Sequence, residues 1–371
     1  MKRLLTCCVL AAALAGPARA DTVVKIGFAG PLTGPIAHVG KDEQFGAQLA
    51  LDDVNAKGLT LNGQKVKFEL VPEDDQADPR VATTVAQRLA DAGVKGVVGH
   101  VTSGAAIPAS RIYEQAGIPA ITPSSTTPKL TQQGFRSIYR VIANDLQQGA
   151  AMARFATGVL KAQRIAIIDD RTAYGQGLAD ALVESLKGLG VTPVGREFTH
   201  DKATDFTAIL TRLKATRPDA VFYGGMDAQG APLLKQMQQL GLKVRFLGGD
   251  GVCTAEMIRI AGPALSADVY CTQAGLAMDR MPGGKDFGAR FRKRFNADVQ
   301  LYAPYSYDAT MALVEAMKLA NSAEPAKYLP LMQKVSFKGV TGPIAFDARG
   351  DSREGGVSLY QFNAGRWESR N

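Results

Sequence analysis

The stretch VKGVVGHVTSGAAIPAS, residues 94–110, contains in direct succession the pattern of a buried strand, a turn and a helix. The strand is an apolar run rich in valine, and the turn places the hydroxyl groups of Thr102 and Ser103 before the helix. Backbone N–H groups and hydroxyls at a helix N-terminus suit an anion. The stretch therefore predicts an anion-binding turn between a strand and a helix.

The same alternation of strand and helix continues along the chain of 371 residues. Short apolar runs lie at 23–30, 66–71, 94–101, 119–122, 164–169, 220–225, 244–249 and 268–274. Segments of helical period lie at 44–55, 79–92, 174–189, 205–215 and 228–240. Strands that are apolar throughout and separated by helices indicate parallel sheets covered on both faces. We therefore expect an α/β protein, and its length favours two domains.

Single residues predict where some of these helices begin and end. Asp78 followed by Pro79 is typical of a helix start, because the aspartate can cap the helix and proline fits its first turn. Gly190 and Gly241 follow two other helical segments and are typical of helix ends.

The first twenty residues have the pattern of an export signal. Lys2 and Arg3 precede an apolar segment, residues 4–15, and the tripeptide at 18–20 fits the small-x-small pattern read by signal peptidase. The apolar segment is too short to span a bilayer. We therefore expect residues 1–20 to be a signal peptide, with cleavage after Ala20.

Removal of this signal leaves two cysteines, Cys253 and Cys271. In an oxidising compartment, two cysteines 18 positions apart favour one disulfide, and two buried free thiols are the alternative. The three histidines, His38, His100 and His200, are scattered and lack the spacing of metal ligands. We expect a disulfide and no metal site.

The charge of the chain does not suggest a nucleic-acid partner. The full sequence carries 43 basic and 35 acidic residues, and loss of the three basic residues of the signal lowers the formal charge from +8 to +5. The remaining basic residues are spread along the chain, whereas a nucleic-acid groove requires a basic cluster. We therefore expect a solvated surface and no nucleic acid.

Polar residues follow several predicted strands. In the first half these strand ends carry hydroxyls and glycines, at 30–34, 100–103 and 122–127. In the second half they carry carboxylates and glycines, at 169–170, 224–226 and 248–250, with Tyr174 nearby. Ligands of open parallel sheets bind beyond the carboxyl ends of the strands. Donors for an anion on one side and acceptors for a cation on the other suit a zwitterion such as a free amino acid, although ordinary turn chemistry is the alternative for each residue alone.

Long stretches of the chain resemble the periplasmic leucine/isoleucine/valine-binding proteins, the type I solute-binding components of ABC importers. The resemblance is carried by GHVTSGAAIPAS (99–110), GIPAITPSSTTPKLTQQGF (117–135), DDRTAYGQGLADAL (169–182) and VFYGGMDAQG (221–230), and it extends from 25–42 to 342–351. It implies two doubly wound parallel-sheet lobes joined by three crossover strands. Lobe 1 would comprise 21–143 plus 273–354, and lobe 2 would comprise 144–272 plus 355–371.

The resemblance also implies which residues bind the ligand. Ser103 and Thr126 would bind its α-carboxylate, and the Ser124 carbonyl, the Thr126 hydroxyl and Asp250 would bind its α-ammonium. Tyr174 would close over the ligand from the second lobe. His100, Asp169 and Asp170 lie close in sequence to these strand ends, and we interpret them as structural.

Some site residues depart from the family pattern. Asp250 is one methylene shorter than the glutamate often found there, so the ammonium must lie deeper or be bound through water. Val39 and Met226 replace aromatic residues of the best-known members, which predicts a more tolerant side-chain pocket. Tyr302, in LYAPYSY (301–307), would line that pocket.

Enzyme classes fit the sequence less well. Residues 101–104 lack the first glycine of a G-x-S-x-G nucleophile elbow, and residues 175–177 are only a fragment of a G-x-G-x-x-G motif. The resemblance instead implies a monomeric periplasmic binding protein, and we expect neither enzyme activity nor a cofactor. It would bind a branched-chain L-amino acid and deliver it to the membrane permease and ATPase subunits of an ABC importer. The alternative is a binder of another small solute (an aromatic amino acid, an amide or a short carboxylate) or a ligand-presenting sensor protein.

Overall fold

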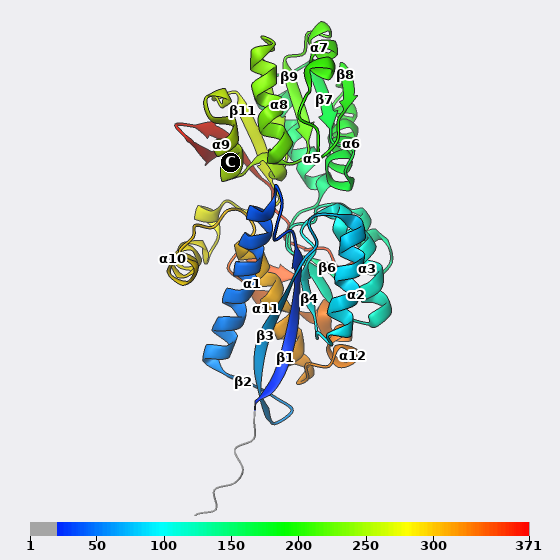
Figure 1. The fold of residues 1–371 in the computed structure, drawn as a ribbon, viewed down its shortest axis with the longest axis vertical. Coiled ribbons are helices and arrows are strands. Elements are labelled where there is room, and N and C mark those ends of the chain that lie inside the picture. Colours follow the sequence, from blue (N-terminus) through cyan, green and yellow to red (C-terminus); the bar gives the residue numbers. More distant parts are fainter. Residues whose placement is uncertain (1–20, 371) are drawn as a thin grey trace, which may run out of the picture.

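Two sheets dominated by parallel strands organise the computed structural model, which describes residues 21–370. We call the part of the chain packed around the first sheet lobe 1 and the part packed around the second lobe 2. The two lobes are stacked along the long axis of the molecule (Figure 1). The predicted signal peptide, residues 1–20, lies outside the described residues.

Lobe 1 is built on a six-stranded sheet of order β2-β3-β1-β4-β5-β6, in which only β2 is antiparallel to its neighbour. Its strands are β1 (Thr22–Gly30), β2 (Leu59–Leu61), β3 (Gln64–Asp74), β4 (Val97–Gly99), β5 (Ala120–Thr122) and β6 (Ile138–Arg140). Its helices are α1 (Ala37–Lys57), α2 (Pro79–Asp91), α3 (Ser103–Ala116), α4 (Lys129–Gln132), α10 (Gly284–Phe295), α11 (Ala303–Ala320) and α12 (Pro325–Tyr328). A hairpin of β12 (Ser336–Lys338) and β13 (Pro343–Ala345) lies beyond α12 in the chain.

Lobe 2 is built on a seven-stranded sheet of order β15-β14-β11-β10-β9-β7-β8. Its parallel strands are β7 (Ile165–Asp169), β8 (Gly195–Phe198), β9 (Ala220–Gly224), β10 (Arg245–Gly248) and β11 (Val269–Gln273). The antiparallel strands β14 (Ser358–Asn363) and β15 (Arg366–Ser369) extend one edge. Its helices are α5 (Asp145–Arg154), α6 (Ala173–Gly188), α7 (Thr207–Ala215), α8 (Asp227–Gln239) and α9 (Ala255–Ala261).

The chain crosses between the lobes three times: between β6 and α5, after β11, and between β13 and β14. All five residues of β7 and all five of β9 are buried, as expected for parallel strands with helices on both faces. The predicted α/β class with two doubly wound sheets and three crossings is confirmed.

The predicted helix boundaries follow from local chemistry. The Asp78 carboxylate accepts hydrogen bonds from Arg80 N (2.7 Å) and Val81 N (3.1 Å), which confirms it as the cap of α2. Gly190 and Gly241 have φ values of 77° and 68°, and this left-handed backbone ends α6 and α8. The first helix was predicted at 44–55, but this start was wrong, because α1 begins at Ala37 and includes Val39.

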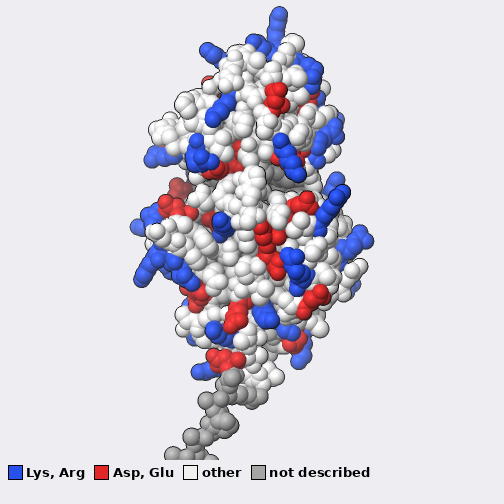
Figure 2. All heavy atoms as spheres, viewed as in Figure 1, with Lys and Arg blue, Asp and Glu red and all other residues white. Residues whose placement is uncertain are grey.

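Acidic and basic side chains are interspersed over both lobes on the face shown in Figure 2. This distribution agrees with the spread of charge along the sequence. Among residues 21–370, no helix is both long and apolar enough to cross a membrane.

Candidate functional site

The carboxylate of Asp250 lies buried at the carboxyl end of β10, where lobe 2 faces lobe 1. Its Oδ1 accepts hydrogen bonds from Tyr174 OH and from Gln148 Nε2, both at 2.8 Å. Its Oδ2 accepts a hydrogen bond from the hydroxyl of Tyr302, which precedes α11 in lobe 1. The structure therefore brings together three of the predicted site residues and adds Gln148, which the sequence analysis missed.

Glycine residues on both sides of Asp250 allow this close packing. A Cβ at Gly249 would lie 2.2 Å from Leu178 Cδ2 and 2.7 Å from the Tyr174 hydroxyl. A Cβ at Gly251 would lie 2.6 Å from Gly225 O. The GGDG sequence at 248–251 therefore permits Tyr174 to reach the carboxylate.

The side-chain partners of Asp250 are neutral. Burial raises the pKa of Asp250, and the hydrogen bonds from Tyr302, Gln148 and Tyr174 oppose this rise. Burial also raises the pKa of both tyrosines well above the usual value, so each keeps its proton and donates. A carboxylate offers about four acceptor positions. The three side-chain donors use three of these positions.

Two hydroxyl-rich loops of lobe 1 meet at Ser103. Ser103, the first residue of α3, accepts hydrogen bonds through its Oγ from Thr127 N (3.4 Å) and from Ser125 Oγ (3.3 Å). Ser124 Oγ donates to Val101 O at 3.0 Å. The hydroxyl of Thr126 is buried and has no hydrogen-bond partner among the described residues. The predicted anion-binding turn and the loop at 122–127 are thus one buried polar cluster.

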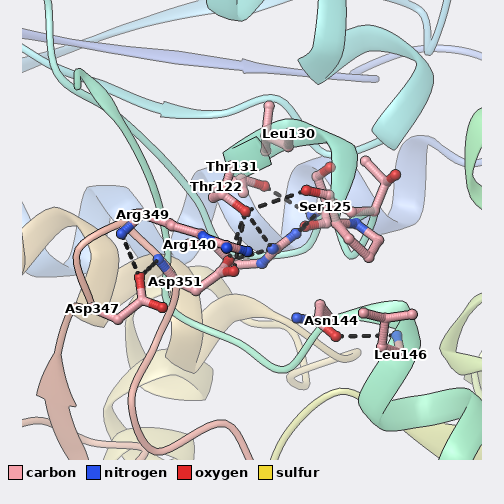
Figure 3. A network of polar contacts seen from close by, with 12 residues as sticks. Thr122, Ser125, Leu130, Thr131, Arg140, Asn144, Leu146, Asp347, Arg349 and Asp351 are labelled. Carbon is pink, nitrogen blue, oxygen red and sulfur yellow. Dashed lines mark hydrogen bonds and ion pairs between the residues drawn. The ribbon is translucent and has the colours of Figure 1, made fainter. Parts of the chain in front are cut away.

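The loop at 122–127 is held by the buried guanidinium of Arg140 (Figure 3). One Nη of Arg140 donates to Ser125 O (3.1 Å) and to Thr127 O (2.7 Å). The other donates to Thr131 Oγ1 at 3.1 Å and pairs with Asp351. Because its donors are directed at two backbone carbonyls, the Thr131 hydroxyl and Asp351, Arg140 shapes the loop without using the Thr126 hydroxyl. Sequence analysis missed this residue.

Two further buried acids lie near the site, and the sequence analysis missed both. Asp145 opens α5, and its backbone N–H donates to Thr126 O at 2.9 Å. Burial raises the pKa of Asp145 to about 7, and the charge of Asp250 adds to this rise. Burial also raises the pKa of Glu43, on α1, well above the usual value. The carboxyl groups of Asp145 and Glu43 have no hydrogen-bond partner in residues 21–370.

A second contact between the lobes joins His38 on α1 to Asp227 at the start of α8. His38 Nε2 lies 2.9 Å from Asp227 Oδ2. Asp227 Oδ2 also accepts a hydrogen bond from the hydroxyl of Thr254. Burial lowers the pKa of His38, but the hydrogen bond and charge of Asp227, with smaller effects of Glu256 and Asp42, produce a net rise. The protonated form of His38 is therefore favoured in this arrangement of the lobes.

The two predicted pocket residues occupy different environments. Val39 lies in the first turn of α1 and is buried in the apolar core of lobe 1. Met226 directly precedes α8, is half-buried, and packs against apolar clusters of both lobes. Met226 therefore contacts both lobes, whereas Val39 belongs to the core of lobe 1.

The residues interpreted as structural have structural partners. His100 Nδ1 lies 2.6 Å from Asp75 Oδ2, and its Nε2 lies 2.9 Å from Tyr113 OH. Asp169 pairs with Arg196 at 2.8 Å. Asp170 accepts hydrogen bonds from the backbone and hydroxyl of Thr172 at the start of α6, at 2.9 Å and 2.6 Å. In the part of the chain that the structure describes, no group of three or more His, Cys, Asp or Glu side chains is placed to hold a metal ion.

The predicted disulfide is present. Cys253 is bonded to Cys271, which lies 18 positions further along the chain. Cys253 follows the 3₁₀ turn at Asp250–Val252, and Cys271 lies in β11. The bond therefore ties the turn that carries Asp250 to the strand from which the chain crosses to lobe 1.

Comparison with known proteins confirms the resemblance read from the sequence. The periplasmic binding protein family matches residues 23–366. The chain is 35% identical over 367 residues to a Leu/Ile/Val-binding protein homolog 1 of Brucella suis, covering 98% of this chain and 97% of that one. Its fold is similar to that of the leucine-binding protein LivK of Thermotoga maritima (TM-score 0.87, 29% identity, 94% and 98% covered). It is also similar to LivJ of Streptococcus pneumoniae in complex with isoleucine (TM-score 0.85, 28% identity, 94% and 98% covered).

Proposed function

This chain belongs to the periplasmic binding protein family, and we propose that it captures a branched-chain L-amino acid between its two lobes for an ABC import permease. The observation that carries the proposal is the buried carboxylate of Asp250. Its three side-chain donors are all neutral, and one of them, Tyr302, comes from lobe 1. Burying a carboxylate is costly unless a charge partner compensates it, and the α-ammonium group of an amino acid is such a partner.

The remaining polar groups suit the other end of a zwitterion. The α-ammonium would bind Asp250, the Ser124 carbonyl and the Thr126 hydroxyl. The α-carboxylate would bind the Ser103 hydroxyl, the Thr126 hydroxyl and the first backbone N–H groups of α3, a helix of 14 residues whose N-terminus favours negative charge. The hydroxyls of Thr102 and Thr126, which are buried without a partner among the described residues, support a polar ligand at this place.

The residues proposed to surround the ligand's side chain are apolar or aromatic, which supports an aliphatic side chain. Tyr174 and Tyr302 cover the Asp250 carboxylate from opposite lobes. Met226 packs against both lobes, and Val39 lies in the core of lobe 1. The isoleucine complex of the similar S. pneumoniae protein supports the same ligand class.

The proposal extends to how the protein is made and used. Residues 1–20 would direct export and be removed after Ala20, so that the mature protein acts in the periplasm as a monomer. Membrane permease and ATPase subunits would be its partners, and it would need no cofactor and perform no catalysis. Membership of the family supports these points.

A thermal-shift screen tests the proposed function. The mature protein is heated with each of the twenty amino acids, with amides and with short carboxylates. A ligand at a hundred times its Kd should stabilise the protein by about 2.7 kcal/mol. We expect leucine, isoleucine and valine to raise the unfolding temperature most. If only amides, aromatic amino acids or short carboxylates do so, the ligand class is wrong; 4-methylpentanoate, which is leucine without its ammonium group, is the matched negative control.

A further inference from the structure

The side chain of Gln148 connects the Asp250 carboxylate to a segment that joins the lobes. Gln148 is fully buried in α5. Its Nε2 donates to Asp250 Oδ1 at 2.8 Å, and its Oε1 accepts a hydrogen bond from Thr272 Oγ1, also at 2.8 Å. Thr272 lies near the end of β11, just before the chain crosses to lobe 1. Three buried residues from three separate parts of the chain thus form one continuous row of hydrogen bonds.

The direction of this row is fixed by chemistry. An ionised carboxylate only accepts hydrogen bonds, so the amide nitrogen of Gln148 must face Asp250. The amide oxygen then faces Thr272, whose hydroxyl must donate. If the hydroxyl were absent, the amide oxygen would be buried without a partner, and the amide would lose the contact that fixes its orientation.

The helix turn that carries Gln148 is held by the other two crossings. Asn144, where the chain arrives from lobe 1, caps α5 and accepts hydrogen bonds from Leu146 N and Gln147 N. Gln147 Nε2 donates to Gly355 O, in the third crossing, at 2.9 Å. The first turn of α5 is therefore in contact with all three segments that join the lobes, and Gln148 extends from that turn to Asp250.

We propose that Gln148 is a positioning residue for ligand binding, which Thr272 orients so that it holds Asp250 in place for the ligand's ammonium group. This inference rests on the proposed function, because it takes Asp250 as the residue that binds the ammonium. Binding of the ligand's ammonium group by Asp250 would therefore depend on Thr272 in β11, the strand that leads into the second crossing. Gln148 and Thr272 need not touch the ligand.

Two substitutions at Thr272 separate this role from simple packing. Thr272→Val keeps the volume and branching of the side chain but removes the hydroxyl, whereas Thr272→Ser keeps the hydroxyl and removes a methyl group. If the hydroxyl orients Gln148, leucine affinity measured by calorimetry should fall about tenfold in Thr272→Val and stay within about threefold of wild type in Thr272→Ser. If Thr272 acts only by packing, Thr272→Ser should lose more leucine affinity than Thr272→Val, because valine fills the buried site better than serine.

A double-mutant cycle extends the test to Gln148. Gln148→Met keeps the length of the side chain and removes its donor, so leucine affinity should fall at least tenfold. Adding Thr272→Val to Gln148→Met should cause little further loss, since both act through the same contact. Independent, additive losses would overturn the proposal.

The matched control is Thr310→Val, which removes a buried hydroxyl that donates to Ser306 O within α11, away from the row. This variant should change unfolding temperature without changing leucine affinity. Wild-type protein that does not bind leucine would refute the proposed function itself. Wild-type protein that binds leucine, together with a Thr272→Val variant of equal affinity, would refute only the role of Gln148.

Discussion

The hydroxyl of Tyr302 in lobe 1 donates a hydrogen bond to the carboxylate of Asp250 in lobe 2. The group that we propose to bind the ligand's ammonium is therefore also part of the contact between the lobes. On this proposal, recognition of the ligand's charge and contact between the lobes depend on the same carboxylate.

Replacement of Tyr302 by phenylalanine should weaken leucine binding. The ring remains, but Asp250 loses one of its three side-chain donors, and a hydrogen bond to a charged group is worth about 1.5–3 kcal/mol. We expect affinity measured by calorimetry to fall roughly ten- to a hundredfold. Tyr307→Phe is the control, because the Tyr307 hydroxyl donates to the Asp53 carboxylate at 2.8 Å within lobe 1. Equal losses in both variants would contradict a specific role for Tyr302.

The contact between His38 and Asp227 predicts a dependence of stability on pH. The net pKa of His38 is raised above its ordinary value of 6.5, so this stabilisation is fully present below about pH 6.5 and is lost as pH rises through the raised value. The charged groups facing the imidazole are Asp227 on α8, Glu256 on α9 and Asp42 on α1. We expect the difference in unfolding temperature between wild type and His38→Gln to be larger at pH 5.5 than at pH 8.5.

Wild type must be compared with His38→Gln because buried acids titrate in the same pH range as His38. Burial raises the pKa of Asp145 to about 7 and that of Asp170 and Asp308 to about 6. Ionisation of these groups therefore also lowers the stability of the folded protein as pH rises. His200→Gln, at an exposed histidine of lobe 2, should leave the pH profile unchanged. If the unfolding temperatures of His38→Gln and wild type change in parallel with pH, the contact between His38 and Asp227 does not contribute to the pH dependence.

Loss of the disulfide should destabilise the protein. On the chain-entropy model, closing a loop of this length contributes about 3 kcal/mol. We expect Cys253→Ala/Cys271→Ala to unfold at lower urea concentration than wild type, and reduced wild type to behave similarly. Mass spectrometry of exported protein under non-reducing conditions checks the bond directly, and two free thiols there would contradict it.

Met226 predicts graded ligand specificity. Because methionine can repack around different ligands, phenylalanine and methionine should displace bound leucine at higher concentrations. Met226→Phe restores a rigid aromatic and should weaken binding of these larger ligands more than that of valine. Met311→Phe, at another half-buried methionine in α11, should leave the competition profile unchanged. Failure of phenylalanine and methionine to compete with wild type, even in large excess, would show that the pocket is not tolerant.

The buried parallel strands were predictable because they are continuous apolar runs. The sequence analysis missed β8, β14 and β15, most of whose residues are half-buried or exposed and which therefore lack such a run. It also missed β6, whose sequence Ile-Tyr-Arg is not an apolar run. Short or edge strands are defined by their pairing, which local sequence does not encode.

The candidate site was predictable where a residue type follows a strand end, as for Asp250, Ser103 and Ser124. Gln148 was not, because its role depends on contacts with Asp250 and Thr272, 102 and 124 positions away. Arg140 was missed for the same reason, since its ion pair is with Asp351, 211 positions along the chain. Residues that support a site through distant partners carry no local signal.

The most direct test of the central claim is calorimetric titration of L-leucine into wild-type protein, Asp250→Ala and Asp250→Glu. Wild type should bind one leucine, and Asp250→Ala should lose roughly 2–5 kcal/mol of binding free energy because the buried ammonium is left unpaired. Asp250→Glu keeps the charge and should retain much of the affinity. Leucine affinity that is unchanged in Asp250→Ala would contradict the account.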